Sequence, residues 1–594
     1  MNRELKIFAV SVILGGAVLA ITSVWNDSII IDEDPHIGAG YSYLTQQDYR
    51  LNPEHPPLAK DIAAIPLLFL NLNRDVFKTH FWLTDINGQW EFGRKLIFNS
   101  GNDADLIAHA AKLPMILFFL FSAWLAFKWA YDRYGQEASI ITLILFSFSP
   151  TILAHTRFVT TDVPALFGAL YSIYFFVRYL RTPSRKSFCL AAAFFGVALL
   201  LKFSTFLLIP LFGLIAMFWG IAHAKKLQEQ LKLMISWGLR ATAVMATGFV
   251  LIVWPVYEFH VWHYPPERQH RDTQTMLSTF GKRYLADPVV WASDKPVLRA
   301  AGQYFLGVLL VIQRSAGGNT SYFLGEVSRT GSRAYFPIVY FLKEPLAWWI
   351  LVLIALCTGI LVKNRKSKSA GIRHLIQTHP DELAMLGWIG IYWFFSIRST
   401  LNIGVRHLLP TYPFAMMLVA GQIAYMTQWI HKKSHKYFKH FVVITAVLLG
   451  WYVFESVHIW PYYLTYFNQI AGGPTGGYRY VADSNLDWGQ DLKRFATWVQ
   501  EQDIPKIEFD YFGWADPAYY LGNRYLWLSS NKYRDARDFI RRNQSNGWIA
   551  VSVSFLQGSI GLVDKPEPIN YTWLKSYEPT AVIGNSIFVW HIMK

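Results

Sequence analysis

The sequence predicts a polytopic α-helical membrane protein with about eleven transmembrane helices, a large first outer loop and a small C-terminal α/β soluble domain. Hydrophobic residues make up 53% of the 594 residues and charged residues only 16%, whereas soluble domains carry about 25% charged residues. Aromatic residues reach 17%, which is typical of chains whose Trp and Tyr side chains lie at membrane interfaces. Apolar runs recur along the chain, and a helix needs about 20 such residues to cross a bilayer.

Eleven apolar runs account for the expected spans. They cover 7–25, 107–129, 138–154, 163–180, 188–201, 203–222, 240–257, 337–362, 383–398, 408–429 and 440–458. The first run also fits a signal peptide, but it is long and no small-residue cleavage site follows it, so we expect a retained span. Cys189 and Cys357 both lie inside apolar runs, so we expect packing residues rather than a disulfide or a metal cluster.

Basic residues gather in six short loops, and this pattern predicts the topology. All six loops fall on one side of the membrane if there are eleven spans, so the positive-inside rule places the N-terminus inside and the C-terminus outside. The net charge of +15 therefore orients helices and does not indicate a nucleic-acid partner. The six loops contain Arg3/Lys6, Lys128/Arg133, Arg178/Arg181/Arg185/Lys186, Lys225/Lys226/Lys232, Lys363/Arg365/Lys366/Lys368 and Lys432/Lys433/Lys436/Lys439.

The opposite side then holds three larger pieces. Residues 1–458 form the transmembrane module, with outer loops at 26–106 and 258–336, and residues 459–594 form the C-terminal domain. Loop 258–336 is rich in Arg and Lys, which suits an anionic lipid head group or acidic lipids, although a solvated surface explains each cation equally well.

The C-terminal part carries both helical and strand patterns. Residues 490–502 and 533–542 have helical spacing, and 506–512, 548–553 and 586–590 read as strands. The polar stretch 483–491 fits a helix N-terminus with Asp487 near the cap, and it equally fits acceptor binding.

The first candidate site residues lie just after the first span. Asp32 and Glu33 are carboxylates at a membrane boundary, where desolvation is costly, so we expect a function for them. His55 precedes a rigid Pro-Pro pair and lies close to Lys60, which also suits a site. In the plainer interpretation, the acids are interfacial caps and the histidine is structural.

Further candidates fall at outer boundaries of later spans. Asp162 opens the fourth span, where it also fits a helix cap. Lys202 interrupts a long apolar run at the depth expected for a lipid phosphate, although snorkelling alone explains it. Lys343, Arg406 and His407 lie at the same depth, and Arg406 has the geometry to hold a phosphate bidentately.

Sugar transfer from a lipid phosphate would use these residue types. The acceptor must lose a proton, which requires a positioned carboxylate as base. The leaving phosphate is a weak base and needs cations or hydrogen-bond donors rather than an acid. The sequence supplies candidates of both kinds at this depth: the carboxylates Asp32, Glu33 and Asp162 for catalysis, and His55, Lys60, Lys202, Lys343, Arg406 and His407 for binding of the donor phosphate and sugar.

These residues also carry a resemblance. Residues 1–430 are similar to the C-type glycosyltransferases, especially the dolichyl-phosphate-mannose–protein mannosyltransferase family and its bacterial phospholipid-carrier-dependent relatives. Asp32-Glu33 matches the acidic pair of that family, the stretch from His55 to Lys60 matches its His-Pro-Pro-Leu-Gly-Lys stretch, and Asp162 matches its second outer-loop acid. The protein mannosyltransferases have a β-trefoil domain that this chain lacks, which puts a protein acceptor in doubt.

The resemblance implies a polyprenyl-phosphate-linked sugar donor and inversion at the anomeric carbon, with Asp32 as the general base. It implies a bacterial inner membrane, an active site on the periplasmic face, and a protein, lipid or polysaccharide acceptor. No cofactor is indicated with certainty, and a divalent metal stays open. The first alternative is a transporter or flippase of a lipid-linked substrate, but the sequence lacks the paired repeats typical of that class. The second is a membrane scaffold, which leaves the acidic residues unexplained.

Overall fold

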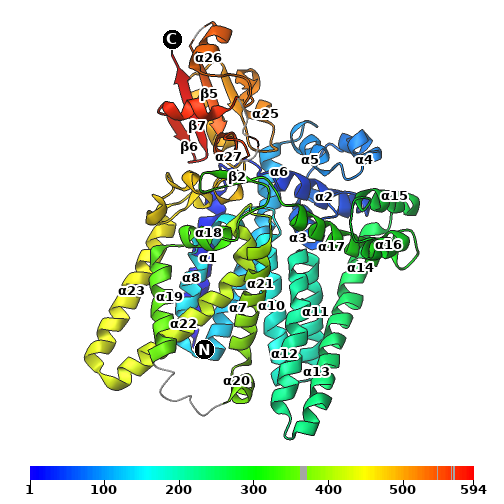
Figure 1. Ribbon diagram of the computed structural model, residues 1–594, viewed down its shortest axis with the longest axis vertical. Helices are drawn as coiled ribbons and strands as arrows, with labels where there is room; N and C mark the ends of the chain where they lie inside the picture. Colours follow the sequence, from blue (N-terminus) through cyan, green and yellow to red (C-terminus); the bar gives the residue numbers. More distant parts are fainter. Residues whose placement is uncertain (362–370, 545, 563–564, 566–568, 594) are drawn as a thin grey trace.

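Long apolar helices run side by side through most of the molecule, and a β-sheet lies beyond one end of them (Figure 1). The computed structural model describes residues 1–361, 371–544, 546–562, 565 and 569–593. The longer helices are α1 (Arg3–Ser23), α7 (Ile116–Tyr134), α10 (Asp162–Arg181), α11 (Arg185–Leu201), α12 (Leu208–His223), α13 (Leu227–Gly248), α19 (Leu346–Leu361), α21 (Pro380–Arg398), α22 (Tyr412–Lys433) and α23 (His435–His458).

The helical membrane architecture is confirmed. Within the described ranges, seven helical stretches are long and apolar enough to cross a membrane, or up to nine if each of two bent helix pairs counts as one span. The bent pairs are α8 (Gln136–Ser147) with α9 (Pro150–Thr156), and α18 (Tyr335–Lys343) with α19. The count of eleven stays a prediction, because α11 has only 17 residues and α21 is not among the qualifying stretches.

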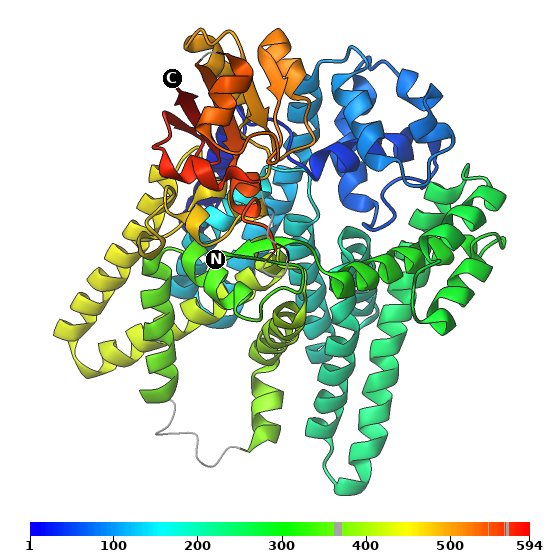
Figure 2. The same ribbon diagram turned by 45° about the horizontal axis from the view of Figure 1, so that its top comes forward.

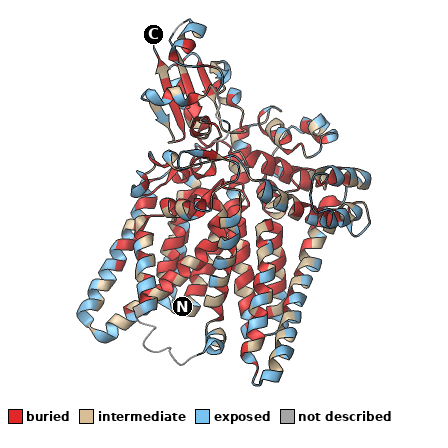
Figure 3. Cartoon of the chain, viewed as in Figure 1, coloured by how far each residue is buried: buried red, intermediate tan, exposed pale blue. Residues whose placement is uncertain are grey.

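The helix connections alternate between the two ends of the bundle. Figures 1 and 2 show the α12–α13 and α22–α23 turns at the end away from the β-sheet. These turns are two of the six basic segments of the sequence, whereas the first loop and the segment after α14 (Trp254–Val261) lie toward the sheet. The outer helices α13 and α23 are exposed over most of their length (Figure 3), as expected for surfaces that face lipid.

The first loop is a compact helical layer at the sheet end. Its main helices are α2 (Glu33–Gln46), α3 (Leu58–Ala64), α5 (Gln89–Phe98) and α6 (Ala104–Lys112), and α15 (Pro266–Met276), α16 (Arg283–Ala292) and α17 (Arg299–Gly317) lie beside them (Figure 1). The backbone of α2 approaches α5 so closely that the contact has no room for a side chain on Gly93. A Cβ on Gly93 would lie 2.2 Å from the Asp34 carbonyl oxygen. A Cβ on Gly40 would lie 2.3 Å from the Lys60 carbonyl oxygen, so both glycines set how α2 is held.

The C-terminal sheet has five strands in the order β4-β3-β5-β7-β6. Its elements are β3 (Ile507–Asp510), β4 (Tyr525–Trp527), β5 (Gly547–Ser552), β6 (Ala581–Ile583) and β7 (Ile587–Ile592), with α24 (Leu492–Glu501), α25 (Pro517–Leu521), α26 (Ala536–Asn543) and α27 (Val553–Gly558). β4, β3 and β5 are parallel, and β5, β7 and β6 are antiparallel. The three predicted strands are confirmed, and β4 and β6 are additional.

Residues 483–491 do not form the helix N-terminus that the sequence predicted with Asp487 near the cap. α24 begins at Leu492, so Asp487 is not its cap. Asp487 instead accepts a hydrogen bond from the Ser554 backbone N–H at 2.8 Å, because residues 483–485 form a short 3₁₀ turn that brings the chain over α27. Residues 459–491 also bond to the membrane part, for example from the Asn468 N–H to the Leu342 carbonyl oxygen at 2.9 Å. The division of the chain into two domains at residue 458 stays a prediction.

Candidate active site

Arg406 joins the first outer acid to the second. It lies in η7 (Val405–Thr411), and its Nη1 donates to Asp32 Oδ2 at 2.8 Å and to Asp162 Oδ2 at 3.2 Å. Asp32 directly precedes α2, and Asp162 is the first residue of α10. Three candidates that are far apart in the sequence therefore meet at one point, at the sheet end of the helices.

Lys202 completes the ion cluster. It follows the last residue of α11, and its Nζ lies 2.5 Å from Asp162 Oδ1. The Asp162 side chain is wholly buried between Lys202 and Arg406. These two cations offset the desolvation of the buried carboxylate, and together with Asp32 the four side chains carry no net charge.

Asp32 and Glu33 are adjacent but have different environments. The Asp32 side chain is 22% exposed, whereas none of the Glu33 side chain is exposed. Glu33 accepts hydrogen bonds from the Ile30 N–H at 3.0 Å and the Val159 N–H at 2.8 Å, and Lys112 lies 3.2 Å away. Burial raises the pKa of Glu33, and the Lys112 charge partly opposes this. Glu33 thus fixes the turn that presents Asp32.

Two histidines of the first loop lie against each other beside the cluster. His36 and His55 rings meet edge to face at 5.1 Å, and His36 Nδ1 lies 2.8 Å from the Val159 carbonyl oxygen. Burial lowers the pKa of both rings, and for His55 the neighbouring positive charges lower it further. Both are therefore neutral near pH 7 and offer hydrogen bonds rather than charge.

Lys60 and Lys343 are buried, and both ammonium groups donate hydrogen bonds to other parts of the protein. Lys60 Nζ donates to Tyr43 Oη at 2.9 Å and to oxygens of Asn52 and His55 at 2.9–3.0 Å, and burial lowers its pKa to about 7. Lys343 Nζ donates to the carbonyl oxygens of Leu464 at 2.8 Å and Asn485 at 2.7 Å. An ammonium has three protons to donate, so Lys60 has none left for a phosphate in this conformation.

The predicted ligand His407 faces the same cluster. Its buried Nε2 makes no hydrogen bond to any residue that the structure describes. The charges of Lys202 and Arg406 act on this ring, and the charge of Asp162 opposes them. Lys202 and Arg406 are the buried cations of this region, and Asp162 is its buried anion.

Sequence reasoning missed the contacts of segment 483–488. Ser484 Oγ accepts from Arg406 Nε at 3.1 Å, and the Trp488 ring lies 4.1 Å from the Arg406 guanidinium carbon. Asp483 has a left-handed backbone (φ 59°), and burial raises its pKa to about 6. The polar density of 483–491 was the available signal, but it did not specify a partner.

The carboxylate pair does not fit a metal ion. Asp32 and Asp162 are already paired with Arg406 and Lys202, which occupy the positions that a cation would take. Across the described part of the chain, no three His, Cys, Asp or Glu side chains are grouped as metal ligands. We therefore derive no step through a metal.

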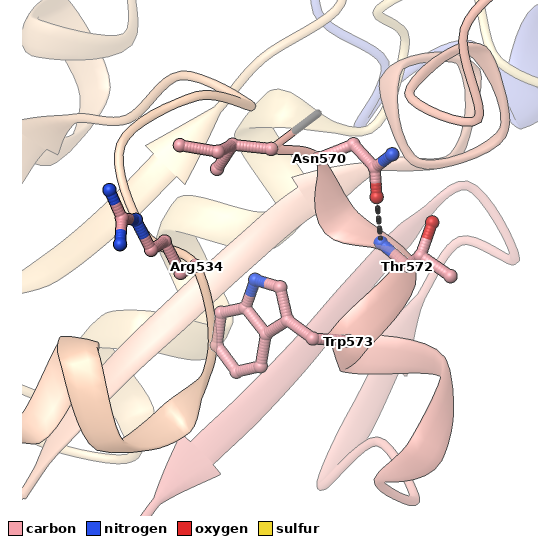
Figure 4. Close-up of a pocket in the computed structure, with 5 residues that line it drawn as sticks. Arg534, Asn570, Thr572 and Trp573 are labelled. Atoms are coloured by element: carbon pink, nitrogen blue, oxygen red, sulfur yellow. Dashed lines mark hydrogen bonds between the residues drawn. The ribbon is translucent and has the colours of Figure 1, made fainter. Parts of the chain in front are cut away.

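A separate pocket lies on the C-terminal sheet region (Figure 4). It has a volume of about 550 Å³ and is lined by Arg534, Ile569, Asn570, Thr572 and Trp573. None of the candidate residues lines it, so it is not part of the Arg406 cluster.

Comparison with known proteins finds a similar sequence over one stretch of the chain and a similar fold. Residues 106–254 match the family described as dolichyl-phosphate-mannose-protein mannosyltransferase, and this stretch includes Asp162 and Lys202. The fold is similar to that of the protein O-mannosyltransferase Pmt1-Pmt2 complex of S. cerevisiae, with a TM-score of 0.54 and 11% identity over 78% of this chain and 90% of that chain. This stretch is therefore similar in sequence to that family, and the chain is similar in fold to the yeast complex.

Two other solved structures align over nearly the whole chain at lower similarity. ArnT from Cupriavidus metallidurans, solved with undecaprenyl phosphate, covers 100% of this chain and 99% of its own at 12% identity and a TM-score of 0.43. The oligosaccharyltransferase AglB from Archaeoglobus fulgidus, solved with an inhibitory peptide and a dolichol-phosphate, covers 95% and 72% at 9% identity and a TM-score of 0.46. No curated protein matches by sequence.

Proposed function

We propose that this protein transfers a sugar from a polyprenyl-phosphate carrier to an acceptor hydroxyl, with inversion, at the sheet end of its helices. The observation that carries the proposal is the Asp32–Arg406–Asp162–Lys202 cluster, in which Asp32 has the most exposed side chain. The family match and the fold support a glycosyltransferase.

Asp32 serves as the general base. Arg406 holds Asp32 Oδ2, and the exposed part of the carboxylate lies where an acceptor hydroxyl has access. The acceptor O–H proton passes to Asp32 as the acceptor oxygen forms a bond to the anomeric carbon. On the opposite face of the sugar, the bond from the anomeric carbon to the phosphate oxygen breaks, so polyprenyl phosphate leaves with the electron pair.

The cations of the cluster stabilise the leaving phosphate. Lys202 and Arg406 supply positive charge in this region, and the rings of His55 and His407 supply hydrogen bonds. Such preorganised groups favour the transition state because the leaving oxygen gains negative charge as the bond breaks. Lys60 and Lys343 fix the loops around this region.

The site faces the outer, periplasmic side of a bacterial inner membrane in this proposal. The basic α12–α13 and α22–α23 turns lie at the end of the bundle opposite the cluster, and the positive-inside rule assigns that end to the cytoplasm.

The test is sugar transfer by purified protein, using radiolabelled polyprenyl-phosphate sugars as donors and a crude envelope fraction as acceptor. We expect Asp32→Asn to lower turnover by at least about 100-fold, the loss typical of a general base, with donor binding retained. The matched control is Asp75→Asn, which changes an exposed acid of the same loop and should keep full turnover. The anomeric configuration of the product reports inversion or retention.

Normal turnover by Asp32→Asn would contradict the assigned base. A folded wild-type protein that transfers no sugar from any donor would contradict the whole proposal, and a lipid-flipping assay would then test the transporter alternative.

A further inference from the structure

Segment 483–490 reaches from the C-terminal part of the chain into the ion cluster. Two of its side chains contact Arg406 directly. Ser484 Oγ accepts from Nε at 3.1 Å, and the guanidinium carbon lies over the Trp488 ring, 4.1 Å from its centre. Trp488 is 1% exposed and Arg406 is 7% exposed, so both contacts are shielded from water.

The same segment forms hydrogen bonds with two other parts of the chain, and the first of these is the stretch just before Asp32. The Ile31 N–H donates to the Trp488 carbonyl oxygen at 3.0 Å, one residue before Asp32. The Ser28 N–H donates to the Gln490 carbonyl oxygen at 2.9 Å, and Ser28 Oγ donates to the Gly489 carbonyl oxygen at 2.8 Å. These bonds fix the backbone of Asp32 relative to Trp488.

On the other side, segment 483–490 holds the loop that carries Arg406. Asn485 Oδ1 accepts from the Val405 N–H at 3.0 Å, and Ser484 Oγ donates to the Ile403 carbonyl oxygen at 2.5 Å. Asn485 Nδ2 also donates to Tyr335 Oη at 2.8 Å, which ties the segment to α18. Segment 483–490 therefore holds both the backbone next to Asp32 and the loop that carries Arg406, although these two residues are far apart in the sequence.

From this geometry we infer that Trp488 and Ser484 are positioning residues that hold the Arg406 guanidinium between Asp32 and Asp162. An unsupported arginine samples many rotamers, whereas a stacked guanidinium with a fixed Nε keeps its remaining N–H groups aimed at the carboxylates. The C-terminal part of the chain is then a component of the site and not a cover over it. The kinetic consequences of this inference rest on the proposed function, but its structural consequence does not.

The structural test is labelling of Arg406 by phenylglyoxal, measured by peptide mass spectrometry on the full-length protein in detergent. Arg406 is protected in the wild type by burial. We expect Trp488→Leu to raise its labelling rate about tenfold, while Trp488→Phe, which keeps an aromatic face, leaves it within about threefold. The matched control is Trp129→Leu, which removes another buried Trp at the opposite end of the bundle and should leave Arg406 protected.

The kinetic test is a double-mutant cycle in the sugar-transfer assay. Trp488→Leu should lower turnover about tenfold in the wild-type background, but no more than about twofold when Arg406 is already replaced by Lys, because Trp488 acts through Arg406. Ser484→Ala, a smaller change, should show the same dependence on Arg406 if Trp488→Leu folds poorly.

Each result decides the inference. Unchanged Arg406 labelling in Trp488→Leu, or an equal loss of turnover in both backgrounds, overturns it. If the wild type transfers no sugar, the proposed function fails, but increased labelling in Trp488→Leu with protection in Trp488→Phe still supports the positioning role.

Discussion

Asp34 is a buried carboxyl group without a partner. None of its surface is exposed, and neither carboxylate oxygen makes a hydrogen bond to a described residue. Burial, and then the negative charge of Glu33, raise the pKa of Asp34 well above its usual range, although the Arg94 charge opposes this. The group therefore keeps its proton at pH values where an exposed Asp is ionised.

The raised pKa predicts a pH-dependent loss of stability. The folded protein binds the Asp34 proton more tightly than the unfolded chain, whose Asp pKa is about 3.9, so stability falls as the pH rises above about 4 toward the folded pKa. We expect Asp34→Asn to reduce the fall in Tm between pH 5 and pH 8, measured by thermal unfolding in detergent. Asp75→Asn, at an exposed position, should leave that fall unchanged. An identical fall in Asp34→Asn and wild type would refute this prediction.

Residue type and depth along the chain predicted part of the site. Asp32, Asp162, Lys202 and Arg406 were expected at one membrane boundary, and the structure brings these four together. The same reasoning did not separate them from Lys60 and Lys343, which lie at equal depth but donate to backbone carbonyl oxygens and a tyrosine. Which acceptor a buried ammonium meets depends on the tertiary arrangement, and sequence spacing does not reveal it.

At the scale of elements, three helices are joined at the end of the bundle opposite the site. Asp381 of α21 accepts from Trp129 Nε1 of α7 at 2.9 Å and forms an ion pair with Arg181 at the end of α10. Arg133 of α7 lies 2.8 Å from Glu382, next to Asp381. Side chains of three helices thus converge on a pair of acids that are largely buried.

Removing the central acid should destabilise this junction. We expect Asp381→Ala to lower the free energy of unfolding by about 1–3 kcal/mol, because it leaves the buried Trp129 N–H without a hydrogen-bond acceptor. The measurement is thermal or denaturant unfolding of the purified protein, with KM in the transfer assay unchanged. The control on α7 is Asp132→Ala, which removes an exposed pair with Lys128 and should change stability by less than about 0.5 kcal/mol. Similar effects of the two substitutions would contradict the prediction.

The sequence predicted long elements better than short ones. The apolar runs and the strands β3, β5 and β7 have clear periodicity, whereas β4 and β6 have three residues each and are defined by pairing with distant strands. The bend of 110° between α18 and α19 lies beside Pro345, so the sequence held a signal for a break but not for its angle.

At the scale of the whole molecule, the short basic turns lie at one end of the bundle, and the β-sheet and the ion cluster lie at the other. If the short basic turns are cytoplasmic, the β-sheet and the ion cluster are on the outer side. This orientation predicts the labelling of single cysteines by a membrane-impermeant maleimide in spheroplasts, after Cys189 and Cys357 are replaced by Ala. Gln502→Cys, exposed after α24, should react in intact spheroplasts, whereas Lys432→Cys, at the α22–α23 turn, should react only after lysis. The opposite pattern would invert the topology.

The bond from Ser28 to Gly489 joins residues that are 461 positions apart in the sequence. During synthesis, the first loop leaves the ribosome long before the segment that fixes Asp32 and Arg406. A ribosome-bound chain that ends before Trp488 holds every predicted site residue but lacks the contacts that align them. We therefore expect Asp32 and Arg406 to become aligned only after segment 488–490 has been synthesised.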